Sequence, residues 1–138
     1  MMTAKNWRLM LPVVIDKLEQ MGKAPNTAVI AMRDSDVLHA LRDTKQAKGI
    51  NLPVEFWRQL PEKLRYPTAI LLETQQKQPT LLFIYKTEQG KVAVKMDYEI
   101  KIKDVLSKKT VKLNMVRTAS LFKDKTALYD FEVLYGSL

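Results

Sequence analysis

The spacing of apolar residues changes halfway along this chain of 138 residues. Within residues 7–21 they recur every three or four positions, which is typical of an amphipathic helix. Within residues 92–99 and 110–118 they alternate with polar residues, which is typical of a strand with one buried face. Because helical patterns come first and alternating patterns follow, the chain is predicted to be an α+β domain with an antiparallel sheet in its second half.

Proline and glycine set the predicted boundaries in the first half. Pro12 suits the first turn of a helix and Gly22 suits its end. Pro53 is expected to open a later helix. Pro61 is expected to close that helix or to start a turn. The predicted helices cover residues 11–21, 36–47 and 53–61, with a short strand at 27–32.

The second half is expected to form a meander of strands. Gly90 is expected to adopt a positive φ in the turn at 87–90. In the alternating segments Val92, Val94, Met96 and Tyr98, and later Val111, Leu113 and Met115, are expected to face inward. The predicted strands cover residues 68–73, 80–86, 91–99 and 110–118, while the aromatic segment 127–135 is assigned neither to helix nor to strand.

Composition excludes several kinds of chemistry. The chain has no cysteine, which excludes disulfides, thiolate catalysis and cysteine-ligated zinc. His39 is its single histidine, so a histidine-rich metal site is also excluded. A carboxylate site for magnesium stays open, but the acidic residues show no ligand-like spacing. We therefore expect no metal and no cofactor.

The net charge of +8 favours binding to polyanions, although a solvated basic surface is the simpler explanation. With 46% hydrophobic residues, the chain is expected to fold as one domain over 1–138. It has no apolar run near the roughly 20 residues of a membrane span and no signal peptide at its N-terminus. Membrane insertion is therefore not expected, and the expected location is the cytoplasm of the producing cell or of a target cell.

Arg117, Thr118 and Ser120 form the most distinctive polar group, at the end of a predicted strand. An arginine can stabilise charge that develops on a phosphate, and hydroxyl groups can hold phosphate oxygens. Ordinary strand-end turn chemistry explains the same residues equally well.

Other side chains could support binding to a phosphate chain. His39 could act as a general base, and Arg42 and Lys45 follow it on a predicted helix. A solvated helix face is the alternative explanation. Tyr85 and Tyr98 could stack on bases, or could pack in the core or at a sheet edge. The further basic candidates are Arg58, Arg65, Lys86, Lys91, Lys95, Lys101, Lys103, Lys108, Lys109 and Lys112.

Six segments, in their order along the chain, resemble the C-terminal domain of phage Mu-type minor head proteins (the MuF group). That domain resembles the barnase, EndoU, colicin-type and RelE-like (BECR) nucleases. The segments are LPVEFWRQLP at 52–61, PTAILL at 67–72, LLFIY at 81–85, GKVAVKMDY at 90–98, VRTA at 116–119 and YG at 135–136.

The resemblance implies a BECR-like fold, with N-terminal helices packed on a four-stranded antiparallel sheet. Residues 1–26 would form an N-terminal helix and loop, and residues 27–136 the family-like core. The implied activity is metal-independent RNA cleavage, in which the ribose 2′-hydroxyl attacks the adjacent phosphate. Related domains often carry a histidine before the helix that opens at Pro53. The segment 45–49 has none here, so Lys48 is the candidate base.

The resemblance thus implies a toxin-like ribonuclease that acts on RNA, with tRNA as one candidate, and that an immunity protein restrains. A phage or a secretion system would deliver it. Two alternatives stay open: a non-catalytic nucleic-acid-binding module of a phage head or injection protein, and a domain that binds a protein partner. The predicted catalytic residues are Lys48, Arg117, Thr118, Ser120 and His39, and the predicted substrate-binding residues are Lys45, Lys95, Arg42 and Arg58.

Overall fold

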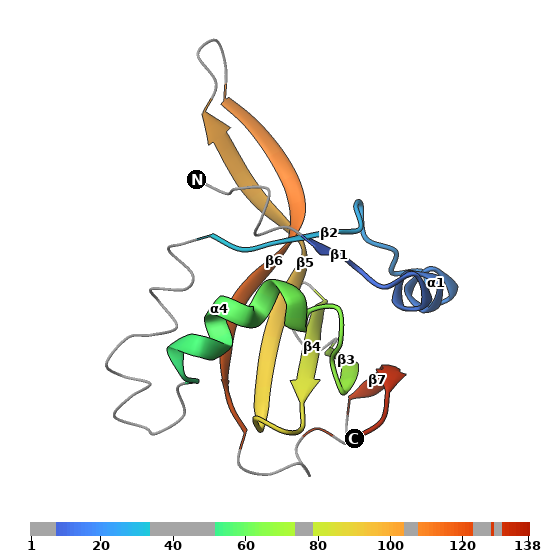
Figure 1. Cartoon of the computed structure of the whole chain (residues 1–138). Helices are drawn as coiled ribbons and strands as arrows, with labels where there is room; N and C mark the ends of the chain where they lie inside the picture. Colours follow the sequence, from blue (N-terminus) through green and yellow to red (C-terminus); the bar gives the residue numbers. More distant parts are fainter. Residues whose placement is uncertain (1–7, 34–51, 74–78, 104–107, 123–127, 129–130) are drawn as a thin grey trace.

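A single curled sheet of seven strands forms most of the described part of the molecule (Figure 1). The computed structural model describes residues 8–33, 52–73, 79–103, 108–122, 128 and 131–138. The strand order is β1-β2-β6-β5-β4-β3-β7, and all neighbours are antiparallel except β2 and β6, which are parallel. The expected α+β, BECR-like fold, with N-terminal helices packed on a four-stranded antiparallel sheet, is therefore wrong, because the described residues are mostly sheet. Two short helices are present in the described part of the chain.

Four consecutive strands form the predicted meander, and a fifth strand extends it. Strand β7 pairs with β3 and so assigns the last residues of the segment that the sequence pattern left open. In the turn before β5, Gln89 adopts the positive φ of 52° that was expected at Gly90. The strands are β3 (Ala69–Glu73), β4 (Thr80–Tyr85), β5 (Gly90–Lys103), β6 (Lys108–Leu121) and β7 (Glu132–Gly136).

The N-terminal segment adds two short strands to the far side of the meander. Strand β1 (Arg8–Leu9) pairs with β2 (Val29–Ala31), and helix α1 (Pro12–Gln20) lies between them in the chain. Strand β2 then pairs with the middle of β6, with Ile30 opposite Asn114. The sequence predicted α1 and β2, but it did not predict that β2 would join the main sheet.

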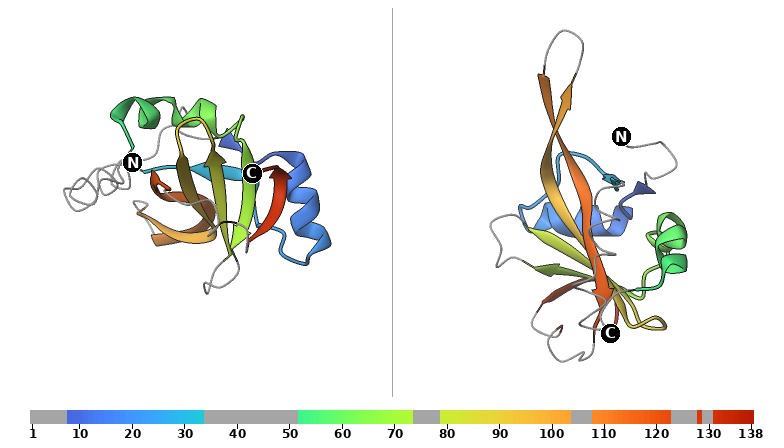
Figure 2. Two further views of the ribbon diagram at one scale, coloured as in Figure 1. Left: turned by 90° about the horizontal axis from the view of Figure 1, so that it is seen from below. Right: turned by 90° about the vertical axis from the view of Figure 1, so that its left-hand side faces the viewer.

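Helix α4 (Val54–Lys63) covers one face of the sheet, which we call the α4 face (Figure 2). Its buried residues Phe56, Trp57 and Leu60 belong to the largest core cluster, with apolar residues of α1 and of the strands. Pro53 caps this helix. Pro61 lies inside it, so the expectation that Pro61 would close the helix or start a turn is wrong.

The opposite face of the sheet is also covered at strands β3 and β4. Leu71, Leu82 and Ile84 pack there against Leu128 and Phe131 from the C-terminal part of the chain. All six residues of β4 are buried for this reason. A strand that is buried on both sides reads as a continuous apolar run, which explains why β3 and β4 do not alternate in sequence.

Two irregularities bend the pairing of β5 with β6. Arg117 is the extra residue of the first, because Ala93 pairs with Thr118 while Val94 pairs with Val116. The second lies between Lys95 and Tyr98. An extra residue shifts the alternation of side chains, so the residues on either side of it no longer share the expected faces.

Asp97, in the second irregularity, has a φ of 54°, a conformation that aspartate tolerates better than most residues. Because of this shift, Met96 stays in the core of the α4 face while Tyr98 faces the opposite side with Met115. The expectation that Val92, Val94, Met96 and Tyr98 share one inward face is therefore wrong for Tyr98.

Asn114 connects this irregularity to the N-terminal segment. Its side chain is fully buried, although the alternating pattern placed it on the polar face of β6. The amide nitrogen donates to the carbonyl oxygens of Thr27 at 2.7 Å and Val29 at 3.0 Å. Its oxygen accepts from the backbone N–H of Asp97 at 3.3 Å. Asn114 thus joins β2, β5 and β6 at one point.

Beyond this point β5 and β6 continue as a two-stranded arm, which we define as residues 98–103 and 108–113. Strand β4 pairs with β5 only as far as Lys95, and β2 pairs with β6 only at Asn114 and Met115. In the described part of the chain, the arm therefore pairs only with itself (Figure 1).

Replacement of Asn114 by leucine is expected to lower the free energy of unfolding by about 2–3 kcal/mol, because it leaves three part-buried backbone groups without their partner. Urea unfolding of the variant, followed by circular dichroism, measures this change. Lys112→Ala, at an exposed position of the same strand, is the control and should change stability by less than about 0.5 kcal/mol. An Asn114→Leu variant as stable as the control would contradict this role.

Candidate functional site

Four of the predicted site residues lie on the neighbouring strands β5 and β6. Lys95 lies on β5, and Arg117, Thr118 and Ser120 lie on β6, at or beside the irregular pairing. Arg58 lies on helix α4, apart from this group, with its side chain 75% exposed and 4.0 Å from Glu55. The remaining predicted residues, His39, Arg42, Lys45 and Lys48, lie outside the described part of the chain.

Tyr98 lies at the centre of this group, with two arginines beside its ring. The guanidinium carbon of Arg117 lies 4.6 Å from the ring centroid, and that of Arg33 lies 5.8 Å from it. All three side chains are half-buried. A cation this close to an aromatic ring is attracted by the negative charge of the ring face, and this attraction orders the flexible arginines.

Three different strands position these residues. Tyr98 faces this side because of the irregularity at Asp97, and Arg117 does so because it is the extra residue of β6. Arg33 follows β2, and the parallel pairing of Ala31 with Met115 brings it to the same place. The cluster therefore depends on the N-terminal segment being joined to β6.

Lys95 and Thr118 extend this group along the sheet. Lys95 alternates with Val94 and Met96, which are in the core of the α4 face, and so it points to the opposite side. Its partners across the neighbouring strands are Thr80 and Met115, and the next residue along this row is Glu73. We call the surface of Arg33, Lys95, Tyr98, Arg117 and Thr118 the Tyr98 face.

Ser120 differs from the other predicted residues because only 8% of it is exposed. It pairs with Lys91, two positions further along β6 from Thr118. The hydroxyl that sequence reasoning assigned to phosphate binding is therefore largely withdrawn from the surface. Thr118 is half-buried and is the more accessible hydroxyl of the two.

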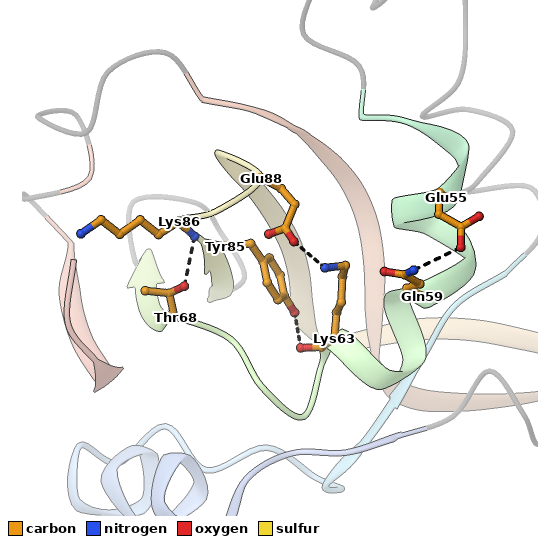
Figure 3. A network of polar contacts seen from close by, with 7 residues as sticks. All are labelled: Glu55, Gln59, Lys63, Thr68, Tyr85, Lys86 and Glu88. Carbon is orange, nitrogen blue, oxygen red and sulfur yellow. Dashed lines mark hydrogen bonds and ion pairs between the residues drawn. The ribbon is translucent and has the colours of Figure 1, made fainter.

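A separate hollow lies between α4 and the turn that joins β4 to β5, with a volume of about 310 Å³. Figure 3 shows the polar contacts around it. The Lys63 ammonium lies 2.7 Å from Glu88 Oε1 and packs over the rings of Phe56 and Tyr85, at 5.1 and 5.6 Å from their centroids. The Tyr85 hydroxyl donates to the carbonyl oxygen of Lys63 at 2.6 Å.

Through these contacts the polar groups around the hollow join α4 to the sheet. Burial raises the pKa of Tyr85, with a smaller contribution from the Glu88 charge, so the phenol stays protonated. The hydrogen bond from Lys63 lowers the pKa of Glu88 below its ordinary value. Since Tyr85 is buried, the alternative of core packing that the sequence left open is the correct one for this residue.

Sequence reasoning considered Tyr98 but did not identify Arg33 or Asn114. Arg33 comes directly after a predicted strand, and only the order of strands in the sheet shows that it reaches Tyr98. Asn114 occupies a polar position of an alternating pattern, which looks like a solvent-facing position. No local sequence signal distinguishes it from the lysines that surround it.

A variant in which glutamine replaces Glu88 is expected to unfold with a weaker dependence on pH than the wild-type protein. Because the pKa of Glu88 is lowered in the folded state, its stabilising effect is present above the pKa of the unfolded chain, about 4.3, and is lost as the pH falls below it. Urea unfolding between pH 7 and pH 3 measures the dependence.

The matched control is Glu19→Gln, at an exposed position of α1, which should keep the wild-type dependence. Identical curves for Glu88→Gln and the wild-type protein would show that the contact with Lys63 adds no pH-dependent stability.

Comparisons with known proteins give no family. No family model, no curated protein and no solved structure matches the chain. The resemblance to the MuF group therefore stays a prediction from the sequence, while the fold that it implied is corrected above. Among the described residues, no helix is long and apolar enough to cross a membrane, and no three histidine, aspartate or glutamate residues gather as metal ligands would.

Proposed function

We propose that this chain binds nucleic acid through the Tyr98 face. The observation that carries the proposal is the packing of Arg33 and Arg117 against the Tyr98 ring. Guanidinium groups bind phosphate oxygens with two parallel hydrogen bonds, and both guanidinium groups and tyrosine rings stack on bases. Few other polyanions offer phosphates and flat rings together.

The charges around this cluster support the same proposal. Lys95 adds a third cation on the Tyr98 face, and the net charge of the chain is +8. Cations attract the nucleic-acid backbone over a long range, and the release of counterions makes the binding sensitive to salt. The Thr118 hydroxyl adds a group that can donate to a phosphate oxygen.

The hollow beside α4 is not part of this proposal. Its lysine, Lys63, already forms an ion pair with Glu88, and the Tyr85 hydroxyl is already bonded to a backbone oxygen. A phosphate there would have to compete with Glu88 for the ammonium group, and the carboxylate charge would oppose its approach.

Metal-independent RNA cleavage is the second proposal. The observation that favours it is that Arg117, Thr118 and Lys95 share one face, as a phosphate-cleaving site requires. In this proposal Arg117 would stabilise charge on the phosphate, and His39 or Lys48 would supply the general base. The substrate would be RNA, with tRNA as a candidate, and an immunity protein would be the partner of such a toxin.

Removal of both arginines from the Tyr98 face is expected to weaken binding to a fluorescent 20-nucleotide RNA by at least about tenfold. The measurement is fluorescence anisotropy with the Arg33→Ala/Arg117→Ala variant over a series of salt concentrations. The slope of log K against log salt should fall by roughly 1–2, because each lost phosphate contact lowers it by about 0.7 for a single strand.

The matched control is Arg58→Ala/Arg65→Ala, which removes the same charge from exposed positions in and just after α4. Equal loss of affinity in the two double variants would reject the Tyr98 face as the binding surface. Failure of the wild-type protein to bind any RNA at low salt would reject the function. Gel analysis of the same mixtures in EDTA tests the second proposal, which requires fragments that Arg117→Ala abolishes.

A further inference from the structure

An apolar cluster borders the Tyr98 face next to the two arginines. Ala31, Ile100 and Met115 are buried there, and Val111 and Leu113, which are half-buried, pack against them with Tyr98. This surface continues from the sheet onto the arm, because Ile100, Val111 and Leu113 are arm residues. Cations and half-buried apolar side chains therefore lie side by side on this side of the sheet and the arm.

The other side of the arm has a different character. Glu99, Lys101, Thr110 and Lys112 alternate with the apolar residues and are exposed. The arm, residues 98–103 and 108–113, contains five lysines, one glutamate and no aspartate, so it is basic as a whole. The exposed lysines Lys101 and Lys112 thus point away from the apolar side, and the two sides of the arm suit different ligands.

A duplex hides the flat faces of its bases in the stack and presents phosphates and base edges. A ligand that offered only phosphate groups would bind best to the charged side of the arm. The apolar surface would add nothing to its binding. An unpaired base exposes both flat faces, so it can stack on a tyrosine ring or on a guanidinium plane. The position of Tyr98 between the cations and the apolar residues fits such a base.

Resting on the proposed function, we infer that the ligand of the Tyr98 face is a single strand, with an unpaired base stacked on the Tyr98–Arg117 pair. The guanidinium of Arg117 lies 4.6 Å from the ring centroid, so base, guanidinium and ring form one stack. Lys95 and Arg33 then bind the phosphates on either side of that base. The remaining bases of the strand lie along the half-buried side chains of Val111 and Leu113.

The test compares a labelled single-stranded RNA of 12 nucleotides, single-stranded DNA of the same sequence and the RNA duplex, each by fluorescence anisotropy at the same salt concentration. The wild-type protein should bind the single strands at least about tenfold more tightly than the duplex. Tyr98→Leu should weaken single-strand binding by about tenfold, which corresponds to the loss of one stacked base. It should change duplex binding by less than about twofold.

Two further variants separate stacking from charge and from folding. Tyr98→Phe keeps the ring and should bind single strands as the wild-type protein does. Arg117→Lys keeps the charge but loses the flat group, so it should reduce the preference for single strands even if Tyr98→Leu fails to fold. Lys101→Ala is the control on the charged side of the arm and should leave this preference unchanged.

The outcomes separate the inference from the proposed function. Binding to the duplex that equals or exceeds binding to the single strands, with no effect of Tyr98→Leu, would overturn the inference and leave nucleic-acid binding standing. Absence of binding to all three ligands would overturn both. A difference between RNA and DNA single strands would show whether the 2′-hydroxyl is recognised.

Discussion

The buried side-chain amide of Asn114 connects parts of this molecule that are far apart in the sequence. It donates to two carbonyl oxygens of the segment at 27–29 and accepts from the backbone of Asp97. A buried amide that lacks such partners would be costly, so these three groups are held in one arrangement. A second contact strengthens the same junction, since the backbone N–H of Asn26 donates to the Asp97 carboxylate at 2.8 Å.

The candidate site depends on this junction. The junction keeps β2 beside β6, which brings Arg33 to Tyr98, and it holds the irregular backbone at Asp97 that turns Tyr98 away from the core. Beyond the junction, β5 and β6 leave the sheet and form the arm. One polar contact in the core thus positions the cations, the aromatic ring and the apolar surface that we propose for nucleic-acid binding.

Local features of the fold could be predicted from the sequence, and non-local ones could not. Helix α1 and the strands of the meander follow from apolar spacing, because each pattern reflects the neighbours of a few consecutive residues. The parallel pairing of β2 with β6 joins residues more than 80 positions apart, and no local pattern records such a pairing. The resemblance to a known family misled the prediction of the sheet for the same reason, since it rested on short apolar segments.

The candidate site was predictable to a similar extent. Arg117 and Thr118 were chosen because a cation and hydroxyls gather at a strand end, and the structure does place them on one surface with Lys95. Ser120, chosen by the same reasoning, is only 8% exposed, which the alternating pattern of this segment did not indicate. Arg33 could not be found, because it reaches Tyr98 only through the non-local pairing.

The most direct test of the account is an NMR titration of the ¹⁵N-labelled protein with a single-stranded RNA of 12 nucleotides. The account predicts that the largest shift changes fall on Arg33, Lys95, Tyr98 and Arg117, and on Val111 and Leu113 of the arm, while Lys63 and Glu88 stay unchanged. Changes confined to Lys101 and Lys112, or to residues around the hollow beside α4, would contradict it.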